Sequence, residues 1–181
     1  MSDSDDETGF DGLIGLAEEE EEEFDWEAEE AEAEEETVTV LRFSVGDRLF
    51  AVRGETVREI TSDLEVTPVP GAPKHVRGVG VIRRRVVGVL NLYEWLDPVA
   101  ERGDVDTHRI IVLEADPFVV GIEATDVSGI DEWPESSLDR SAIPETIGAR
   151  TRRYALGVQL VEDDAIVLLD APRLLQDAAV Q

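Results

Sequence analysis

The side chains that most often carry chemistry are scarce in this sequence, and those present lack the spacing of a catalytic or metal site. The chain has no cysteine, which excludes disulfides and thiol chemistry. His75 and His108 are its two histidines, and they stand 33 residues apart, which matches no metal-ligand spacing. We therefore expect no catalytic residue, no metal and no cofactor.

Glycines and paired carboxylates also fall short of a recognisable site. Gly78, Gly80 and Gly88 are followed by no Gly-Lys-Ser/Thr sequence, so they predict strand bends rather than a phosphate-binding loop. Asp163 and Asp164 stand where a turn is expected and lack the spaced ligands of a calcium loop. A small β-barrel hydrolase or ligand-binding enzyme remains an alternative hypothesis, supported only by carboxylates that the sequence cannot assign.

Three consecutive arginines are the most distinctive charged feature. Arg83, Arg84 and Arg85 lie between apolar stretches at 79–82 and 86–90, which predicts a β-hairpin with the arginines at its tip. Successive side chains of a strand point to opposite faces, so at least one arginine should point away from the core. The triplet is either a cationic patch for carboxylates of a protein partner or a charged tip that balances nearby acidic groups.

Net charge narrows the range of partners. The 181 residues include 43 acidic and 16 basic side chains, a net charge of −27, which argues against nucleic acid or an anionic membrane surface as a partner. Lys74 is the single lysine. Many acidic residues with so little lysine suggest a very salty cytoplasm, where the Debye length falls to about 3 Å.

The acidic residues are concentrated at the start of the chain. Residues 1–36 hold 19 of the 43 and no Lys or Arg. Such a segment repels itself and buries little, so we expect a disordered acidic leader, although apolar islands at 13–16 and 24–26 also suit docking motifs. No apolar stretch reaches the roughly 18 residues of a membrane helix and no secretory signal is visible, which predicts a cytoplasmic location.

From residue 37 onward the pattern is that of short β-strands. Residues 37–45 are rich in β-branched side chains, and Gly46-Asp47 predicts a two-residue turn before a returning strand at 49–52. Turn residues also separate further strand pairs: 79–82 with 86–90, 109–114 with 118–122, and 155–161 with 165–169. A short helix is expected at 92–97, and a C-terminal helix after an Asp170 cap.

These elements predict one mainly β domain over residues 37–181 with two small β-barrel lobes. The polar segment 99–106 separates two groups of strands of similar size, so we place the boundary between the lobes there.

Two stretches carry a recognisable pattern: residues 67–79 read TPVPGAPKHVRGV, and residues 57–60 read Val-Arg-Glu-Ile. They resemble the CheW-type chemotaxis coupling family, whose members have prolines followed by Val-x-Gly-Val and, upstream, Val-x-Glu-Ile. The strand at 86–92, the segments 119–122 and 126–128, and the end of the last strand with its helix also fit. The resemblance covers about residues 37–177.

The resemblance implies two SH3-like five-stranded β-barrels and an adaptor without catalytic activity. Family members link the cytoplasmic tips of chemoreceptors to the histidine kinase CheA. Carried over by position, Glu59 and Arg83 would lie on the partner-binding surface with Val57 beside them, and we add Arg84 and Arg85 from the triplet. We expect the free protein to be a monomer.

The hairpin tip departs from the family pattern. Where the family has Asn-Leu-Arg-Gly, this chain has Val81-Ile82-Arg83-Arg84. A turn that used glycine for a positive φ must here be built by arginine or be strained. This change supports an alternative hypothesis, in which a diverged CheW-like module serves another signalling complex and the acidic leader is a docking element.

Overall fold

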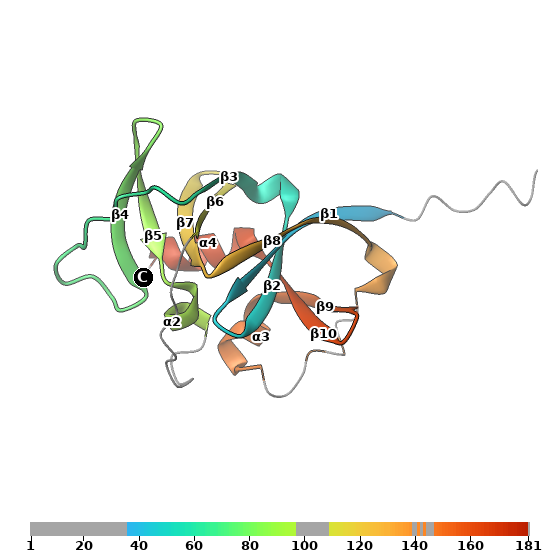
Figure 1. Cartoon of the computed structure of the whole chain (residues 1–181). Coiled ribbons are helices and arrows are strands. Elements are labelled where there is room, and N and C mark those ends of the chain that lie inside the picture. The colour runs from blue at the N-terminus through green and yellow to red at the C-terminus, as the bar shows by residue number, and fades with distance from the viewer. Residues whose placement is uncertain (1–35, 97–108, 139–140, 142, 144–146, 181) are drawn as a thin grey trace, which may run out of the picture. The chain divides into compact units, whose positions relative to one another are not determined.

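The computed structural model describes residues 36–96, 109–138, 141, 143 and 147–180 (Figure 1). The predicted leader, apart from Glu36, and the predicted boundary at 99–106 lie outside the described residues.

Two five-stranded sheets make up most of the described chain (Figure 1). In spatial order the first sheet contains β8 (Asp126–Pro134), β1 (Thr37–Val45), β2 (Arg48–Arg53), β10 (Asp164–Leu169) and β9 (Ala155–Val161). In spatial order the second sheet contains β3 (Val57–Thr61), β6 (Arg109–Ala115), β7 (Phe118–Ala124), β5 (Arg85–Leu90) and β4 (Val76–Ile82). The mainly β class with two five-stranded sheets is confirmed.

Both sheets follow the same plan. Three antiparallel strands, β8-β1-β2 in one and β3-β6-β7 in the other, are joined to an antiparallel hairpin. In each sheet the hairpin pairs in parallel with the three-stranded part, β10 with β2 in the first sheet and β5 with β7 in the second. These parallel pairs were not anticipated, because a sequence shows which segments are strands more readily than which strands meet.

The strands before and after residues 99–106 do not form two separate lobes, so the predicted boundary between the lobes is wrong. Strands β6 and β7, which follow that segment, complete the sheet begun by β3, β4 and β5. Strands β8 to β10 return to the sheet begun by β1 and β2. The chain therefore leaves the first lobe after β2, builds the whole second lobe, and then returns.

All four predicted hairpins are confirmed. Val45 pairs with Arg48, which leaves Gly46 and Asp47 as the two-residue turn, and Gly46 has a φ of 64° as a glycine at the first turn position can adopt. Strand β8 was missed because its nine residues, DVSGIDEWP, show no regular alternation of apolar and polar side chains.

Helices are few and short. They are α2 (Leu92–Leu96), α3 (Ala149–Tyr154) and α4 (Ala171–Val180), with 3-10 turns η1 (Gly54–Thr56) and η2 (Glu135–Ser137). The predicted cap is present, since the Asp170 carboxylate accepts a hydrogen bond from the Arg173 N–H at 3.1 Å. None of the helices that the structure describes is long and apolar enough to cross a membrane.

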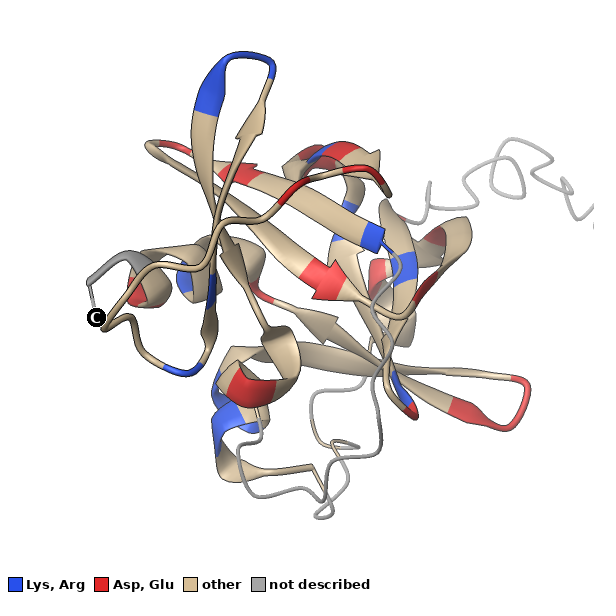
Figure 2. Cartoon of the chain, turned by 60° about the vertical axis from the view of Figure 1, so that its left-hand side comes forward, with Lys and Arg blue, Asp and Glu red and all other residues tan. Residues whose placement is uncertain are grey.

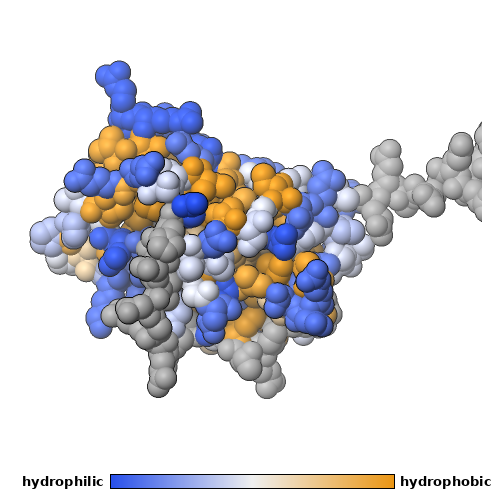
Figure 3. Space-filling model, viewed as in Figure 1, coloured by the Kyte–Doolittle hydropathy of each residue, from blue (hydrophilic) through white to orange (hydrophobic). Residues whose placement is uncertain are grey.

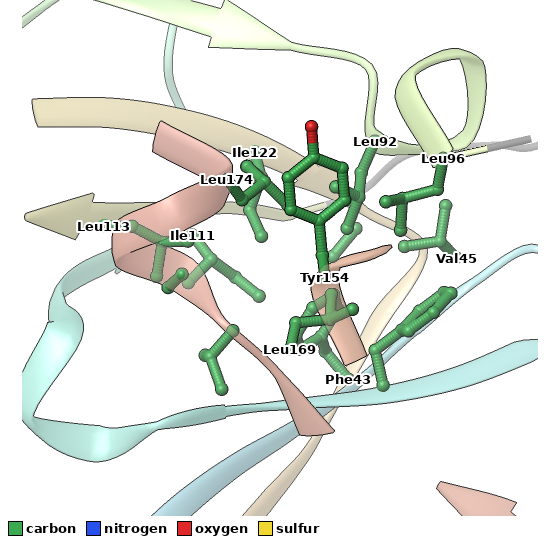
Figure 4. Packing of buried hydrophobic residues seen from close by; sticks show 14 of the residues in the cluster. Phe43, Val45, Leu92, Leu96, Ile111, Leu113, Ile122, Tyr154, Leu169 and Leu174 are labelled. Atoms are coloured by element: carbon green, nitrogen blue, oxygen red, sulfur yellow. The ribbon is translucent and has the colours of Figure 1, made fainter. Parts of the chain in front are cut away.

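One apolar cluster joins the two sheets. It takes Phe43 and Leu169 from the first sheet, Ile111 from the second, and Leu174 from α4, each at most 2% exposed. Helix α4 follows β10 of the first sheet yet packs against β6 and β7 of the second. Figure 4 shows the Tyr154 ring inside this cluster with its hydroxyl directed outward, where it donates a hydrogen bond to Asp177 at 2.9 Å.

The proline-rich segment before β4 is strapped to that strand by backbone hydrogen bonds. Thr67 and Val79 each donate an N–H to the other's carbonyl, at 2.8 and 2.9 Å. Gly78 permits this approach, because a Cβ at that position would lie 2.2 Å from the Thr67 carbonyl oxygen. The strap covers the outer edge of β4, which would otherwise offer unpaired backbone groups to other chains.

Gly78→Ala should therefore lower the free energy of unfolding by roughly 3 kcal/mol or more, since backbone atoms must move to admit the methyl group. Gly88→Ala is the matched control, because a Cβ on Gly88 meets nothing within 4 Å, and a change of less than about 0.5 kcal/mol is expected there. Urea unfolding measures both. Equal effects of the two substitutions would contradict the strap.

His75 ends the strap within an aromatic cluster. Its ring meets Trp95 edge-on at 4.4 Å between centroids, and the Arg150 guanidinium lies 5.5 Å from the Trp95 ring centre. Burial, and secondly the Arg150 charge, lower the pKa of His75 from its usual value. The folded protein thus favours the neutral imidazole.

This shift predicts acid sensitivity of the fold. The unfolded chain binds a proton at His75 near pH 6.5, before the folded protein does, so His75 lowers the free energy of unfolding as the pH falls below about 6.5. His75→Phe keeps a ring against Trp95 and removes the proton-binding group. Chemical unfolding at about pH 7.5 and about pH 5.5 should show a smaller loss of stability in His75→Phe than in the parent. An equal loss in both proteins would contradict this role.

Candidate partner-binding surface

The arginine-bearing tip is a tight turn at the end of the β4–β5 hairpin, which projects beyond the neighbouring strands (Figure 1). Ile82 pairs with Arg85, so the turn consists of Arg83 and Arg84 alone, and Arg85 already belongs to β5. Arg83 and Arg84 have φ values of 45° and 68°. Such turns suit the twist of a hairpin but favour Asn and Gly, and a positive φ costs other residues about 1–2 kcal/mol each.

Arg83 reaches across to Glu59 on β3. Its Nε lies 2.7 Å from a Glu59 carboxylate oxygen, with the arginine side chain 72% exposed and the glutamate 26% exposed. That oxygen is otherwise buried and has no partner in hydrogen-bond geometry, so the contact with Arg83 is ionic rather than an aligned hydrogen bond. An ion pair this exposed contributes at most about 1 kcal/mol to stability.

The contact depends on the curvature of the second sheet. Strands β3 and β4 are its two edges in the order of hydrogen-bonded strands, yet Glu59 of β3 meets the residue that follows β4. The sheet must therefore curl until its edges approach, as in a barrel. A small hollow lies at this end, lined by Arg58, Arg83 and Arg85 above apolar side chains of β4 to β7.

The other three predicted site residues differ in exposure. Arg84 and Arg85 are exposed, and among the described residues neither has a carboxylate within ion-pair distance. Val57 is half-buried and packs against the cluster between the sheets, two residues before Glu59 on β3. Glu59, Arg83 and Arg85 thus gather at one end of the second sheet, while Val57 supports the strand that carries Glu59.

Sequence reasoning missed two neighbours on β3. Arg58 is exposed and forms an ion pair with Glu114, and Ile60 is 40% exposed. The alternation of strand side chains was the available signal: if Val57 and Glu59 face inward, then Arg58 and Ile60 face outward.

Positive charge is concentrated at this tip. Figure 2 shows the end of the projecting hairpin in blue, while acidic residues, in red, are spread over other strands, turns and helices. Within the described part of the chain, no group of three or more His, Asp or Glu side chains could hold a metal ion. Exposed guanidinium groups such as these are able to pair with carboxylates.

The fold and this surface define a two-barrel β domain with a charged, projecting hairpin tip. Comparison with known proteins gives the particular family. The sequence profile of the CheW-like domain matches residues 39–179. The chain belongs to the CheW-like domain family, and this membership supports an adaptor role in chemotaxis.

Individual relatives agree with this assignment. The chemotaxis protein CheW of Rhizobium meliloti (strain 1021) is 33% identical over 131 residues, which cover 72% of this chain and 83% of that protein. Protein FrzA of Myxococcus xanthus is 31% identical over 139 residues, covering 75% of this chain and 84% of that protein. The crystal structure of the scaffolding protein TtCheW from Thermoanaerobacter tengcongensis superimposes with a TM-score of 0.64 at 21% identity, covering 75% and 86% of the two chains. This last likeness concerns the fold alone.

The backbone of the tip generates a stability prediction. Arg84→Gly should raise the free energy of unfolding by roughly 0.5–1 kcal/mol, because relief at positive φ exceeds the extra freedom of glycine in the unfolded chain. Arg85→Gly removes the same charge from an ordinary strand position and should lower stability by about 1 kcal/mol. Thermal and urea unfolding measure both. Destabilisation of similar size in both variants would show that Arg84 carries no strain.

Proposed function

We propose that this chain is a non-enzymatic adaptor of the cytoplasm that couples chemoreceptors to a CheA-type histidine kinase. Its family membership supports an adaptor role, and Glu59 and Arg83, which the family resemblance assigns to partner contact, meet near the hairpin tip. The observation that carries the proposal is the Glu59–Arg83 pair at 2.7 Å, on the exposed end of the second sheet.

The adaptor works by geometry. An apolar core shared by two barrels holds surface features of both lobes in fixed positions, so two partners can be held at a defined separation without rearrangement of the scaffold. Control of the kinase then comes from how the proteins assemble, and no bond is made or broken by this chain.

Charge at the tip sets which partner binds. A partner that presents a carboxylate to Arg83, or a cation to Glu59, satisfies both groups as water is excluded. A partner that leaves either group buried and unpaired is rejected, because an uncompensated buried charge costs several kcal/mol. The intramolecular pair keeps both side chains oriented before binding.

Swapping the charges of Arg83 and Glu59 distinguishes a role in binding the partner from a role in stabilising the fold. Arg83→Ala and Glu59→Ala should each weaken binding to the kinase or receptor fragment by about tenfold, roughly 1.4 kcal/mol. The effect on thermal stability should be small, because an ion pair with so exposed an arginine contributes at most about 1 kcal/mol. The double variant Arg83→Glu with Glu59→Arg restores the internal pair but presents the wrong charges to the partner, so binding should stay weak. Calorimetric titration and thermal unfolding measure the two effects.

Arg53→Ala is the matched control, since Arg53 forms an ion pair with Glu135 at 2.8 Å on the first sheet and its flank. Its binding should equal that of the parent if partners dock at the tip. Full recovery of binding in the exchanged double variant would mean that the pair acts only within the fold. Binding of the parent to neither kinase nor receptor would overturn the proposal.

A further inference from the structure

An exposed apolar pair lies directly behind the arginine tip. Val81 and Val86 are cross-strand partners in the β4–β5 hairpin, and they are 65% and 72% exposed. Two other exposed apolar residues have no exposed apolar partner of similar size across the strands. Ile130 on β8 pairs with the buried Leu41, and Leu160 on β9 pairs with the small Ala165. Figure 3 shows apolar surface immediately below the hydrophilic end of the hairpin.

The pair does not serve the core of its own sheet. The neighbouring residues Ile82 and Val87 point inward and are 9% and 2% exposed, so Val81 and Val86 necessarily face outward. A strand position facing water needs only β-propensity, which polar threonine also supplies. Two exposed valines side by side at a projecting tip are suited to burial against a second molecule.

Cationic groups border the apolar pair. Arg83, Arg84 and Arg85 are all exposed, and in the described part of the chain Arg83 has the Glu59 carboxylate beside it, while Arg84 and Arg85 have none within ion-pair distance. In a chain of net charge −27, this is a local inversion of sign. It attracts carboxylates and repels lysine-rich surfaces.

We propose that the tip recognises a protein segment that presents one or two aliphatic side chains bordered by Asp or Glu. Val81 and Val86 supply affinity by burial, and the arginines supply selectivity for acidic flanks. The inference deepens the proposed function, because it states the chemistry of the partner that docks at this tip. It also adds Val81 and Val86 as partner-contact residues beside Glu59 and Arg83.

The same division of roles predicts the response to salt. Molar salt screens the attraction between arginines and carboxylates, whereas salts excluded from protein surfaces strengthen burial of apolar groups. Binding that rests on the valine pair therefore persists in concentrated salt, while discrimination between acidic and basic flanks weakens.

Short synthetic peptides test the proposal without kinase or receptor. The ¹⁵N-labelled full-length chain is titrated with three of them and followed by NMR: a Leu-Val centre with Asp and Glu flanks, an Ala-Ala centre with the same flanks, and a Leu-Val centre with Lys flanks. We expect the first alone to shift the amide signals of β4 and β5, with the largest changes near Val81 and Val86.

Matched variants assign the two contributions. Val81→Thr with Val86→Thr keeps the β-branched shape and should weaken binding of the first peptide by about tenfold through loss of apolar burial. Ile130→Thr changes an equally exposed residue on the first sheet and should leave binding unchanged. Arg84→Gln with Arg85→Gln should reduce the preference for acidic over lysine flanks.

Equal binding of the acid-flanked and lysine-flanked peptides, or equal losses with Ile130→Thr and with the paired valine substitutions, would overturn the inference. So would tip signals that move only with protein concentration, which would identify a second copy of this chain as the occupant. Peptide binding at the tip without capture of kinase or receptor would defeat the proposed function alone. Capture that depends on Glu59 and Arg83 without peptide binding would defeat this inference alone.

Discussion

Burial of both sheets in one apolar cluster is the constraint on which the rest of the structure depends. The clusters confined to a single sheet are small: one centres on Val40 and Leu168, the other on Ile82, Val87 and Val112. The shared cluster draws on both sheets and on α2, α3 and α4, and each fully buried aliphatic side chain contributes roughly 1.5–3 kcal/mol. Interleaved strand order strengthens this dependence, because the whole second sheet lies between β2 and β8 along the chain. The two barrels are therefore parts of one folding unit.

A rigid interior frees the periphery for contact. The β4–β5 tip retains two residues at positive φ, a pair of exposed valines and charges in excess of their local partners. None of these features adds to stability, and a tip selected for stability would carry Gly or Asn in the turn and polar residues behind it. Departures of this kind are expected where a surface serves binding, and the core supplies the stability that offsets them.

Local features of the sequence predicted much of this fold, and pairings between distant segments predicted little. The turn at Gly46 and the cap at Asp170 were correct because each depends on a few adjacent residues. The parallel pairs and the return of β8 to β1 depend on burial across the whole domain, which no local pattern records. At the site, the arginine tip followed from the hairpin pattern, and Glu59 was assigned by family resemblance. The contact of Glu59 with Arg83 could not be predicted, because it depends on the curvature of the second sheet. The outward direction of Arg58 could have been predicted from the alternation of side chains along a strand.

Reconstitution of the three-part assembly tests whether this chain links two other proteins by geometry. Chemoreceptor cytoplasmic fragments are fixed on vesicles, the CheA-type kinase is added, and sedimentation is measured with and without the full-length chain. We expect the kinase to sediment with the receptors only when the chain is present, and the chain to sediment with them. Sedimentation of the kinase to the same extent without the chain, or of the chain with receptors while the kinase stays in solution, would contradict this expectation.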